Sequence, residues 1–286
     1  MYPEIQKEWQ SRLNSLVDER ENLTCGKLAR KQKLAESRNS EIVKVKGFGK
    51  IVSADGQKVH YKIHLKYLMK QGEHFYFEEE IEQRIARIDQ GCVIEDAAVV
   101  RPEEEAVPED SDLDSGALLE RVPFYYDRLK AVQYAERWWN SHNPDFPHFP
   151  VDCTNYISQC LHAGGAPMRG FLERGKGWWM RQKNWSYSWT VAHAFKWYLA
   201  SSATGLRAKE MPSAEMLQPG DVICYDFQGD GRFDHSTIVT AMDANGQPLV
   251  NAHTTNSRMR YWSYEDSTAY TENIKYKFYS IQDDRT

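Results

Sequence analysis

The sequence predicts an α+β protein built from two domains. Its 286 residues exceed one typical small domain, and a hydrophobic content of 41% is sufficient for packed cores. Helical spacing of apolar residues near the start gives way to strict alternation, which is typical of antiparallel strands. A second set of helices and strands follows an acidic stretch. We therefore expect domains at residues 1–100 and 121–286, joined by a linker at 101–120.

The first domain is expected to combine one long helix with an antiparallel sheet. Apolar residues recur at helical spacing across residues 4–38. Residues 42–52 and 59–67 alternate between apolar and polar side chains, and Asp55-Gly56 between them is typical of a hairpin turn. We identify no catalytic pattern in this domain, and its role is not predicted.

Charge and composition narrow the range of functions. The net charge is −5, which gives no reason to expect nucleic acid or an anionic membrane as a partner. No stretch approaches the roughly 18 apolar residues of a membrane-spanning helix, and the first residues lack the pattern of a signal peptide. The 5 cysteines have neither paired nor metal-like spacing, so a reducing, cytoplasmic setting is expected.

A cysteine is predicted at the start of a helix in the second domain. Pro150 and Asp152 mark the helix start, and Gly164-Gly165 end it after an apolar stripe. Cys153 therefore lies in the first turn, where backbone N–H groups and the helix dipole favour a thiolate. A thiolate is the nucleophilic form, and nearby N–H groups can bind an oxyanion. The alternative is that Cys153 is a buried core residue and that Asp152 only caps the helix.

Two histidines in a predicted hairpin are candidates for a general base and its orienting partner. His235 opens the strand 235–242, the turn 243–247 follows, and His253 lies on the return strand. With a two-residue turn, His235 would face Asn256, and His253 would point to the other side of the sheet. With a three-residue turn, His253 would lie diagonal to His235 on the same face. Because both registers are possible, His253 and Asn256 are alternatives.

Two further patterns have competing interpretations. The acidic loop with Asp226, Asp230 and Asp234 could bind a cation, but its spacing differs from the EF-hand pattern, and a glycine-rich connection is preferred. Tryptophans between the cysteine and histidine motifs either wall a groove for a sugar or peptide or pack in the core. The residues assigned to substrate binding are Asp152, Trp178, Trp179 and Trp189. No metal ion or organic cofactor is expected.

Several of these segments resemble one known family. Residues 152–159, with the sequence DCTNYISQ, look like the nucleophile helix of the Putative amidase domain found in many Firmicute proteins. Residues 126–135 are similar to the opening helix of that family, and residues 234–240 and 252–256 to its histidine strand and return strand. That family is in turn similar to CHAP and NlpC-type cell-wall peptidases, which share a papain-like fold.

The resemblance implies a papain-like cysteine amidase or peptidase that acts through a thioester. Cys153 would be the nucleophile, and His235 would remove its proton and later protonate the leaving amine. His253 or Asn256 would be the third catalytic residue. A peptide or peptidoglycan fragment is the substrate that the resemblance implies. A non-catalytic module that binds a peptide or glycan, and an acyl or peptidyl transferase, are the alternatives.

Overall fold

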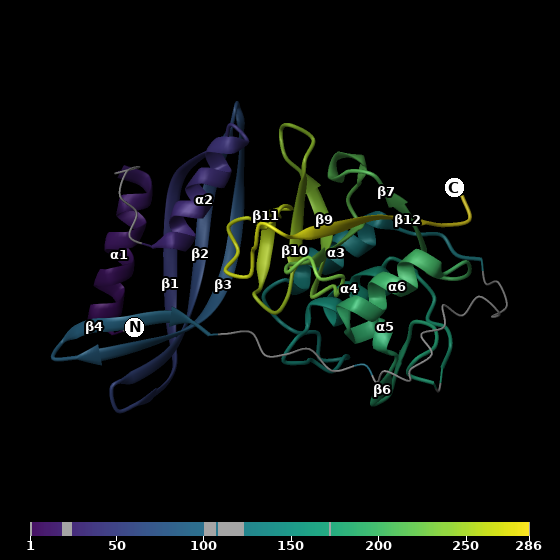
Figure 1. The fold of residues 1–286 in the computed structure, drawn as a ribbon, viewed down its shortest axis with the longest axis horizontal. Coiled ribbons are helices and arrows are strands. Elements are labelled where there is room, and N and C mark those ends of the chain that lie inside the picture. Colours follow the sequence, from purple (N-terminus) through teal and green to yellow (C-terminus); the bar gives the residue numbers. More distant parts are fainter. Residues whose placement is uncertain (1, 19–24, 100–106, 108–122, 172, 286) are drawn as a thin grey trace. The chain divides into compact units, whose positions relative to one another are not determined.

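The chain forms two compact units, each of which combines helices with antiparallel strands, as predicted for the α+β class (Figure 1). The computed structural model describes residues 2–18, 25–99, 107, 123–171 and 173–285. The N-terminal unit comprises Met1–Arg101 and Thr255–Tyr270, and the C-terminal unit comprises Pro102–Thr254 and Thr271–Thr286. The expected linker at 101–120 lies outside the described residues, except for Val107. Within the described ranges, no helix is long and apolar enough to cross a membrane.

The N-terminal unit places two helices on one face of its strands. The helices are α1 (Pro3–Asp18) and α2 (Gly26–Ser37), and the strands are β1 (Glu41–Asp55), β2 (Lys58–Gln71), β3 (His74–Asp89), β4 (Cys92–Ala98) and β11 (Ser257–Tyr261). The strands pair in the order β1-β2-β3-β11, and β4 also pairs with β3. Alternate residues of β2, such as Tyr61, Ile63 and Leu65, are buried together with Trp9 and Leu13 of α1.

Two predictions for this unit have different outcomes. The hairpin is confirmed, because Asp55 pairs with Lys58 and Gly56 has the positive φ of 55° that such a turn favours. The single helix over residues 4–38 is wrong. Cys25 has an extended backbone, with φ −91° and ψ 106°, and a new helix begins at Gly26. The apolar spacing persists across the break because both helices cover the same core.

The C-terminal unit is an antiparallel sheet with helices packed on it. Its longer helices are α3 (Arg128–Trp138), α4 (Cys153–Ala163) and α6 (Ala192–Ser201), and α5 (Tyr187–Thr190) is a single turn. Its sheet has the strand order β10-β9-β8-β12-β7. These strands are β7 (Arg207–Met211), β8 (Val222–Asp226), β9 (His235–Met242), β10 (Pro248–Ala252) and β12 (Lys275–Gln282). The short elements β5 (Met180–Arg181), β6 (Asn184–Trp185) and η1 (Ala214–Met216) complete the unit.

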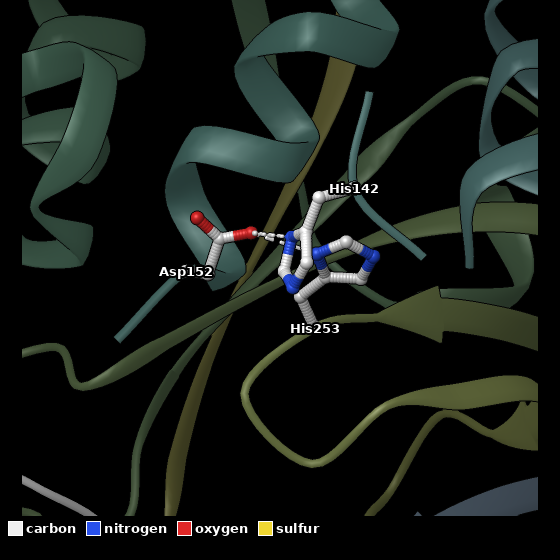
Figure 2. A group of neighbouring side chains, drawn as sticks. All are labelled: His142, Asp152 and His253. Atoms are coloured by element: carbon white, nitrogen blue, oxygen red, sulfur yellow. Dashed lines mark hydrogen bonds and ion pairs between the residues drawn. The ribbon is translucent and has the colours of Figure 1, made fainter. Parts of the chain in front are cut away.

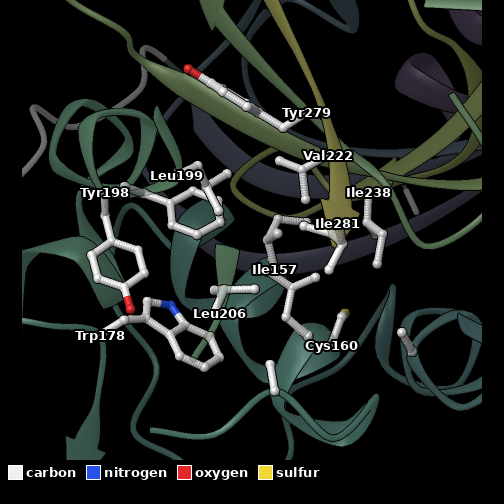
Figure 3. Close-up of a cluster of buried hydrophobic side chains, with 14 of the residues drawn as sticks. Ile157, Cys160, Trp178, Tyr198, Leu199, Leu206, Val222, Ile238, Tyr279 and Ile281 are labelled. Atoms are coloured by element: carbon white, nitrogen blue, oxygen red, sulfur yellow. The ribbon is translucent and has the colours of Figure 1, made fainter. Parts of the chain in front are cut away.

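The core of this unit fixes α4 on one face of the sheet. Ile157 and Cys160 of α4 pack against Val222 of β8 and Ile238 of β9, with Leu199 of α6 beside them (Figure 3). All five side chains are fully buried. Each large apolar side chain of this kind contributes about 1.5–3 kcal/mol when it is buried. The helix that begins with Cys153 is therefore held in place along its length.

Candidate active site

Asp152 fixes the loop that leads into α4. One of its carboxylate oxygens, Oδ1, accepts hydrogen bonds from the backbone N–H of Phe149 and the side-chain amide of Asn155, both at 2.9 Å. Asp152 occupies the N-cap position as expected, but its side chain makes no capping hydrogen bond to the first turn. The amide of Asn155 is itself held, because the indole N–H of Trp189 donates to its oxygen at 2.9 Å. These bonds define where the helix begins.

Cys153 is the first residue of α4, as the sequence predicts, and it is fully buried. The N–H groups of Asp152 and Cys153 both donate to one oxygen, Oγ1 of Thr254, at 3.0 Å and 3.2 Å. Thr254 adopts a φ of 78°, which a β-branched residue rarely does and which costs about 1–3 kcal/mol. Two backbone N–H groups thus converge on one hydroxyl oxygen, and the residue that supplies this oxygen, Thr254, has a strained backbone.

His253 is joined to Asp152 rather than to His235. Its Nδ1 lies 2.8 Å from Oδ2 of Asp152 (Figure 2). Its Nε2 lies 2.8 Å from the carbonyl oxygen of Trp138. The imidazole stacks on the ring of Tyr156, with the ring centroids 3.9 Å apart. Both nitrogens therefore face oxygen acceptors, and the orientation of the ring is fixed by three neighbours.

A second histidine, His142, reaches the same carboxylate. Its Nδ1 lies 3.4 Å from Oδ2 of Asp152, and Figure 2 shows both imidazoles beside that oxygen. Burial alone would raise the pKa of Asp152, but hydrogen bonds from His142 and His253 lower this pKa to about 2. Asp152 is therefore ionised at neutral pH, although only 3% of its surface is exposed. The three residues form one charged cluster beside Cys153.

The hairpin of β9 and β10 has a register that neither predicted alternative describes in full. Beside the turn, Pro248 pairs with Met242, as the three-residue turn requires, and Gly246 has the expected positive φ of 74°. An irregularity then shifts the pairing by one residue, so that Asn251 pairs with Ile238. This bulge changes which side chains share a face further along the strands.

The bulge ends the register that would place His253 diagonal to His235, so the expected diagonal pair is wrong. On β9, which begins at His235, the hydroxyl of Ser236 lies 3.4 Å from Oγ1 of Thr154 in α4. The His235 ring approaches those of Tyr225 and Phe227, with centroids 5.7 Å and 6.0 Å away. His253 instead contacts Trp138 of α3 and Tyr156 of α4.

Asn256, the alternative third residue, belongs to a different part of the molecule. It lies in the segment Thr255–Tyr270, which forms part of the N-terminal unit. Its backbone carbonyl accepts a hydrogen bond from the N–H of Ile81 at 2.8 Å. The return strand β10 ends at Ala252, so the pairing of Asn256 with His235 in a two-residue-turn register is wrong.

The tryptophans assigned to a substrate groove pack inside the protein. Trp178 and Trp189 are fully buried with ring centroids 4.6 Å apart, and only 2% of Trp179 is exposed. Each indole N–H has an internal acceptor: Ser158 for Trp178, Lys176 for Trp179 and Asn155 for Trp189. The groove prediction is wrong for these three residues, since burial with a satisfied N–H is the behaviour of core tryptophans.

The acidic loop between β8 and β9 uses its carboxylates to hold its own backbone. The two oxygens of Asp226 accept from the N–H groups of Gly229 and Gly231, at 2.7 Å and 2.8 Å. Asp234 accepts from the N–H of Phe227 at 3.1 Å. Gly229 and Gly231 have φ of 74° and 93°, so the glycines allow the turns that these hydrogen bonds require. This geometry agrees with the preferred interpretation as a glycine-rich connection.

Two residues of this site, His142 and Thr254, were not identified from the sequence. His142 lies in the loop after α3, ten residues before Asp152. No sequence spacing predicts that a histidine in this loop lies close to His253. Thr254 follows His253 directly, but its positive φ has no sequence signature, because threonine normally avoids that region. Repeated aromatic and proline residues between Trp139 and Asp152 were the available sign that this loop is structured.

Comparison with known proteins assigns the C-terminal unit to a family. The family described as "Putative amidase domain" matches residues 125–279, more than half of the chain. A Bacillus subtilis (strain 168) protein described as "Uncharacterized protein YhbB" is 52% identical over 270 residues, covering 91% of this chain and 87% of its own length. Another from that strain, "Uncharacterized protein YjcM", is 32% identical over 140 residues, covering 46% of this chain and 31% of its own. No solved structure matches. The chain therefore belongs to the Putative amidase domain family.

Proposed function

We propose that the C-terminal unit is a cysteine amidase that cleaves an amide bond through a thioester on Cys153. The observation that carries the proposal is the convergence of two backbone N–H groups, those of Asp152 and Cys153, on one oxygen, Oγ1 of Thr254. Two amides that meet at one oxygen are the usual means of stabilising the oxyanion of acyl transfer. The family name and the position of Cys153 at a helix start agree with this chemistry.

In this proposal the carbonyl oxygen of the substrate takes the place of the Thr254 hydroxyl. Thr254 Oγ1 holds the two donors in the resting protein, and the strain at its φ of 78° makes this segment ready to move. The thiolate of Cys153 then attacks the carbonyl carbon, the amine leaves with a proton, and water hydrolyses the thioester. The peptidase resemblance favours a papain-like fold and a peptidoglycan-type peptide as substrate.

We assign the role of general base to His235 and a positioning role to His253. His235 opens β9 next to Ser236, and the Ser236 hydroxyl contacts Thr154, the residue after Cys153. His253 has Asp152 and the Trp138 carbonyl as partners, so it holds the helix start rather than the base. The two histidines therefore have separable effects: loss of His235 removes proton transfer, whereas loss of His253 loosens the loop before Cys153.

The test uses the full chain with peptidoglycan-type peptides, and the released amine is measured by mass spectrometry. We expect Cys153→Ala and His235→Asn each to reduce release at least about 100-fold. Cys160→Ala is the matched control, because Cys160 lies on the same helix but in the apolar core. If Cys153→Ala releases amine at the wild-type rate, the proposal is wrong.

The same experiment separates hydrolysis from the two alternatives. With an added amine acceptor such as glycine amide, a transferase would form the new amide in place of the free acid. A binding module would retain the peptide in equilibrium dialysis without releasing amine. Only release of amine together with the free carboxylic acid, and a transient mass increase on Cys153, agrees with the proposed hydrolase.

A further inference from the structure

We propose that His142, Asp152 and His253 form a binding site for a transition-metal ion of the zinc class. One ligand atom from each residue lies within 4.8 Å of the other two, and the three come from different segments. His142 lies in the loop after α3, Asp152 precedes α4, and His253 follows β10. The site lies beside Cys153, but the inference does not rest on the proposed amidase reaction.

The orientation of the rings points to coordination through Nδ1. The carbonyl of Trp138 accepts the N–H at Nε2 of His253, which leaves Nδ1 of that ring directed at Asp152. A metal-binding histidine commonly donates its other N–H to a backbone carbonyl in this way. Nδ1 of His142 points to the same carboxylate oxygen.

The carboxylate is held as a metal ligand would be. Its Oδ1 is occupied by the N–H of Phe149 and the amide of Asn155, which leaves Oδ2 alone toward the two histidines. Ligand atoms around a tetrahedral zinc ion lie about 3.3 Å apart. The separations to Oδ2 are 2.8 Å and 3.4 Å, so small side-chain rotations suffice to admit the ion.

The ligand atoms indicate the class of metal, and their exposure indicates the side from which the ion enters. Two imidazole nitrogens and one carboxylate oxygen suit zinc and its neighbours, whereas calcium and magnesium prefer oxygen ligands. The His142 side chain is 44% exposed, whereas those of Asp152 and His253 are only 4% and 3% exposed. The ion would therefore enter from the side of His142 and keep a water molecule there as its fourth ligand. Bound metal would tie together the three segments that surround the start of α4.

The experiment measures metal binding by the full chain, independently of any enzymatic activity. Chelator-treated protein is titrated with Zn²⁺ by calorimetry and with Co²⁺ by visible absorption. We expect one equivalent of either ion to bind, and bound Co²⁺ to show the absorption bands of tetrahedral coordination. His142→Ala should weaken binding at least about tenfold, and because His142 is exposed its loss should leave the fold intact.

Two control variants make the result specific. His148 is exposed and stacks on His142 with ring centroids 4.7 Å apart, yet it is not one of the three ligands, so His148→Ala should bind metal like the wild type. Cys153→Ala should also bind normally, which separates this site from any metal held by the thiol. Failure of the wild type to bind one equivalent, or equal affinity in His142→Ala, would overturn the proposal and leave a purely hydrogen-bonded cluster.

Discussion

Buried carboxylates in the two units have partners of different chemistry. In the N-terminal unit, Glu78 is 1% exposed and pairs with Lys31 and Arg38, whose charges are permanent at ordinary pH. In the C-terminal unit, Asp152 is 3% exposed and pairs with two histidines, His142 and His253. Lysine and arginine can only neutralise a carboxylate, whereas histidine can also lose its proton or bind a metal. We infer that the first pairing serves stability and the second serves chemistry.

The N-terminal carboxylates belong to a larger ion network. Arg260 donates to Asp266, and Lys31 bridges Glu78 and Asp266. Burial alone would raise the pKa of Glu78, but Arg38 and Lys31 together lower it. A fully paired buried network contributes little net stability compared with an apolar core, but removing one member leaves an uncompensated charge. The first prediction uses this asymmetry.

The largest expected effect is the loss of Lys31. Lys31→Met leaves Glu78 and Asp266 each without one cation, and we expect the free energy of unfolding of the N-terminal unit to fall by about 3–5 kcal/mol. Urea denaturation measures the change. Arg87→Met is the control in the same unit, because its pair with Glu95 is exposed and should contribute about 0–1 kcal/mol. Equal effects of the two variants would contradict the assignment of a structural role to the network.

The pH dependence of stability gives the next largest effect. The folded-state pKa of Glu78 is lowered, so its stabilising contribution is complete above the unfolded-state value, near 4.5, and is lost as the pH falls through the folded-state value. Each unit of pKa difference corresponds to about 1.4 kcal/mol. Urea denaturation from pH 7 to pH 3 should show this loss in the N-terminal unit. Glu78→Gln should flatten the curve, and an unchanged slope would exclude Glu78 as its source.

A smaller stability effect is expected at Asp152. Asp152→Asn keeps the shape of the side chain but removes the charge beside the histidines, and we expect a loss of about 1–3 kcal/mol in the C-terminal unit. The proposed amidase activity should fall much more than the stability does, because the variant disturbs the start of α4. A variant as unstable as Lys31→Met, but with normal activity, would show that Asp152 is structural in the same sense as Glu78.

The smallest effect on stability is expected for Trp189, which contacts Asp152 only through Asn155. Trp189→Phe keeps most of the buried ring but removes the N–H that donates to Asn155, which in turn holds Asp152. We expect a loss of about 1 kcal/mol in thermal or urea unfolding. Trp178→Phe removes a similar N–H, whose acceptor is Ser158, and serves as the matched control. Only Trp189→Phe should lower the proposed amidase activity, since only its partner, Asn155, contacts Asp152.

Local signals in the sequence were sufficient for the helix start and the hairpin turns. Asp152 and the glycines after Ala163 locate α4, and Gly246 locates the turn between β9 and β10. The bulge between the turn and His253 has no such signal, because it depends on how side chains of the two strands pack on the helices. A shift of one residue in register is enough to separate His235 from His253. The helices and turns were therefore easier to predict than which side chains of the site contact one another.

The tryptophans show the same limit for packing. The sequence places Trp178, Trp179 and Trp189 between the cysteine and histidine motifs, but their spacing could not distinguish a groove wall from a buried core. That distinction depends on acceptors for the indole N–H groups, and two of the three, Ser158 and Asn155, lie on α4. Such contacts between distant segments are not visible in local patterns.

The return of Thr255–Tyr270 to the N-terminal unit has a consequence for the order in which the chain is made. Lys31 and its partner Asp266 are 235 positions apart, and β11 of this segment supplies a strand beside β3. At about 5–20 residues per second, roughly 12–47 seconds of synthesis separate the two ends of this ion pair. Until then a nascent N-terminal unit carries Lys31 without Asp266 and one edge of β3 without its partner strand. Its final assembly is therefore expected to wait until most of the C-terminal unit has been synthesised.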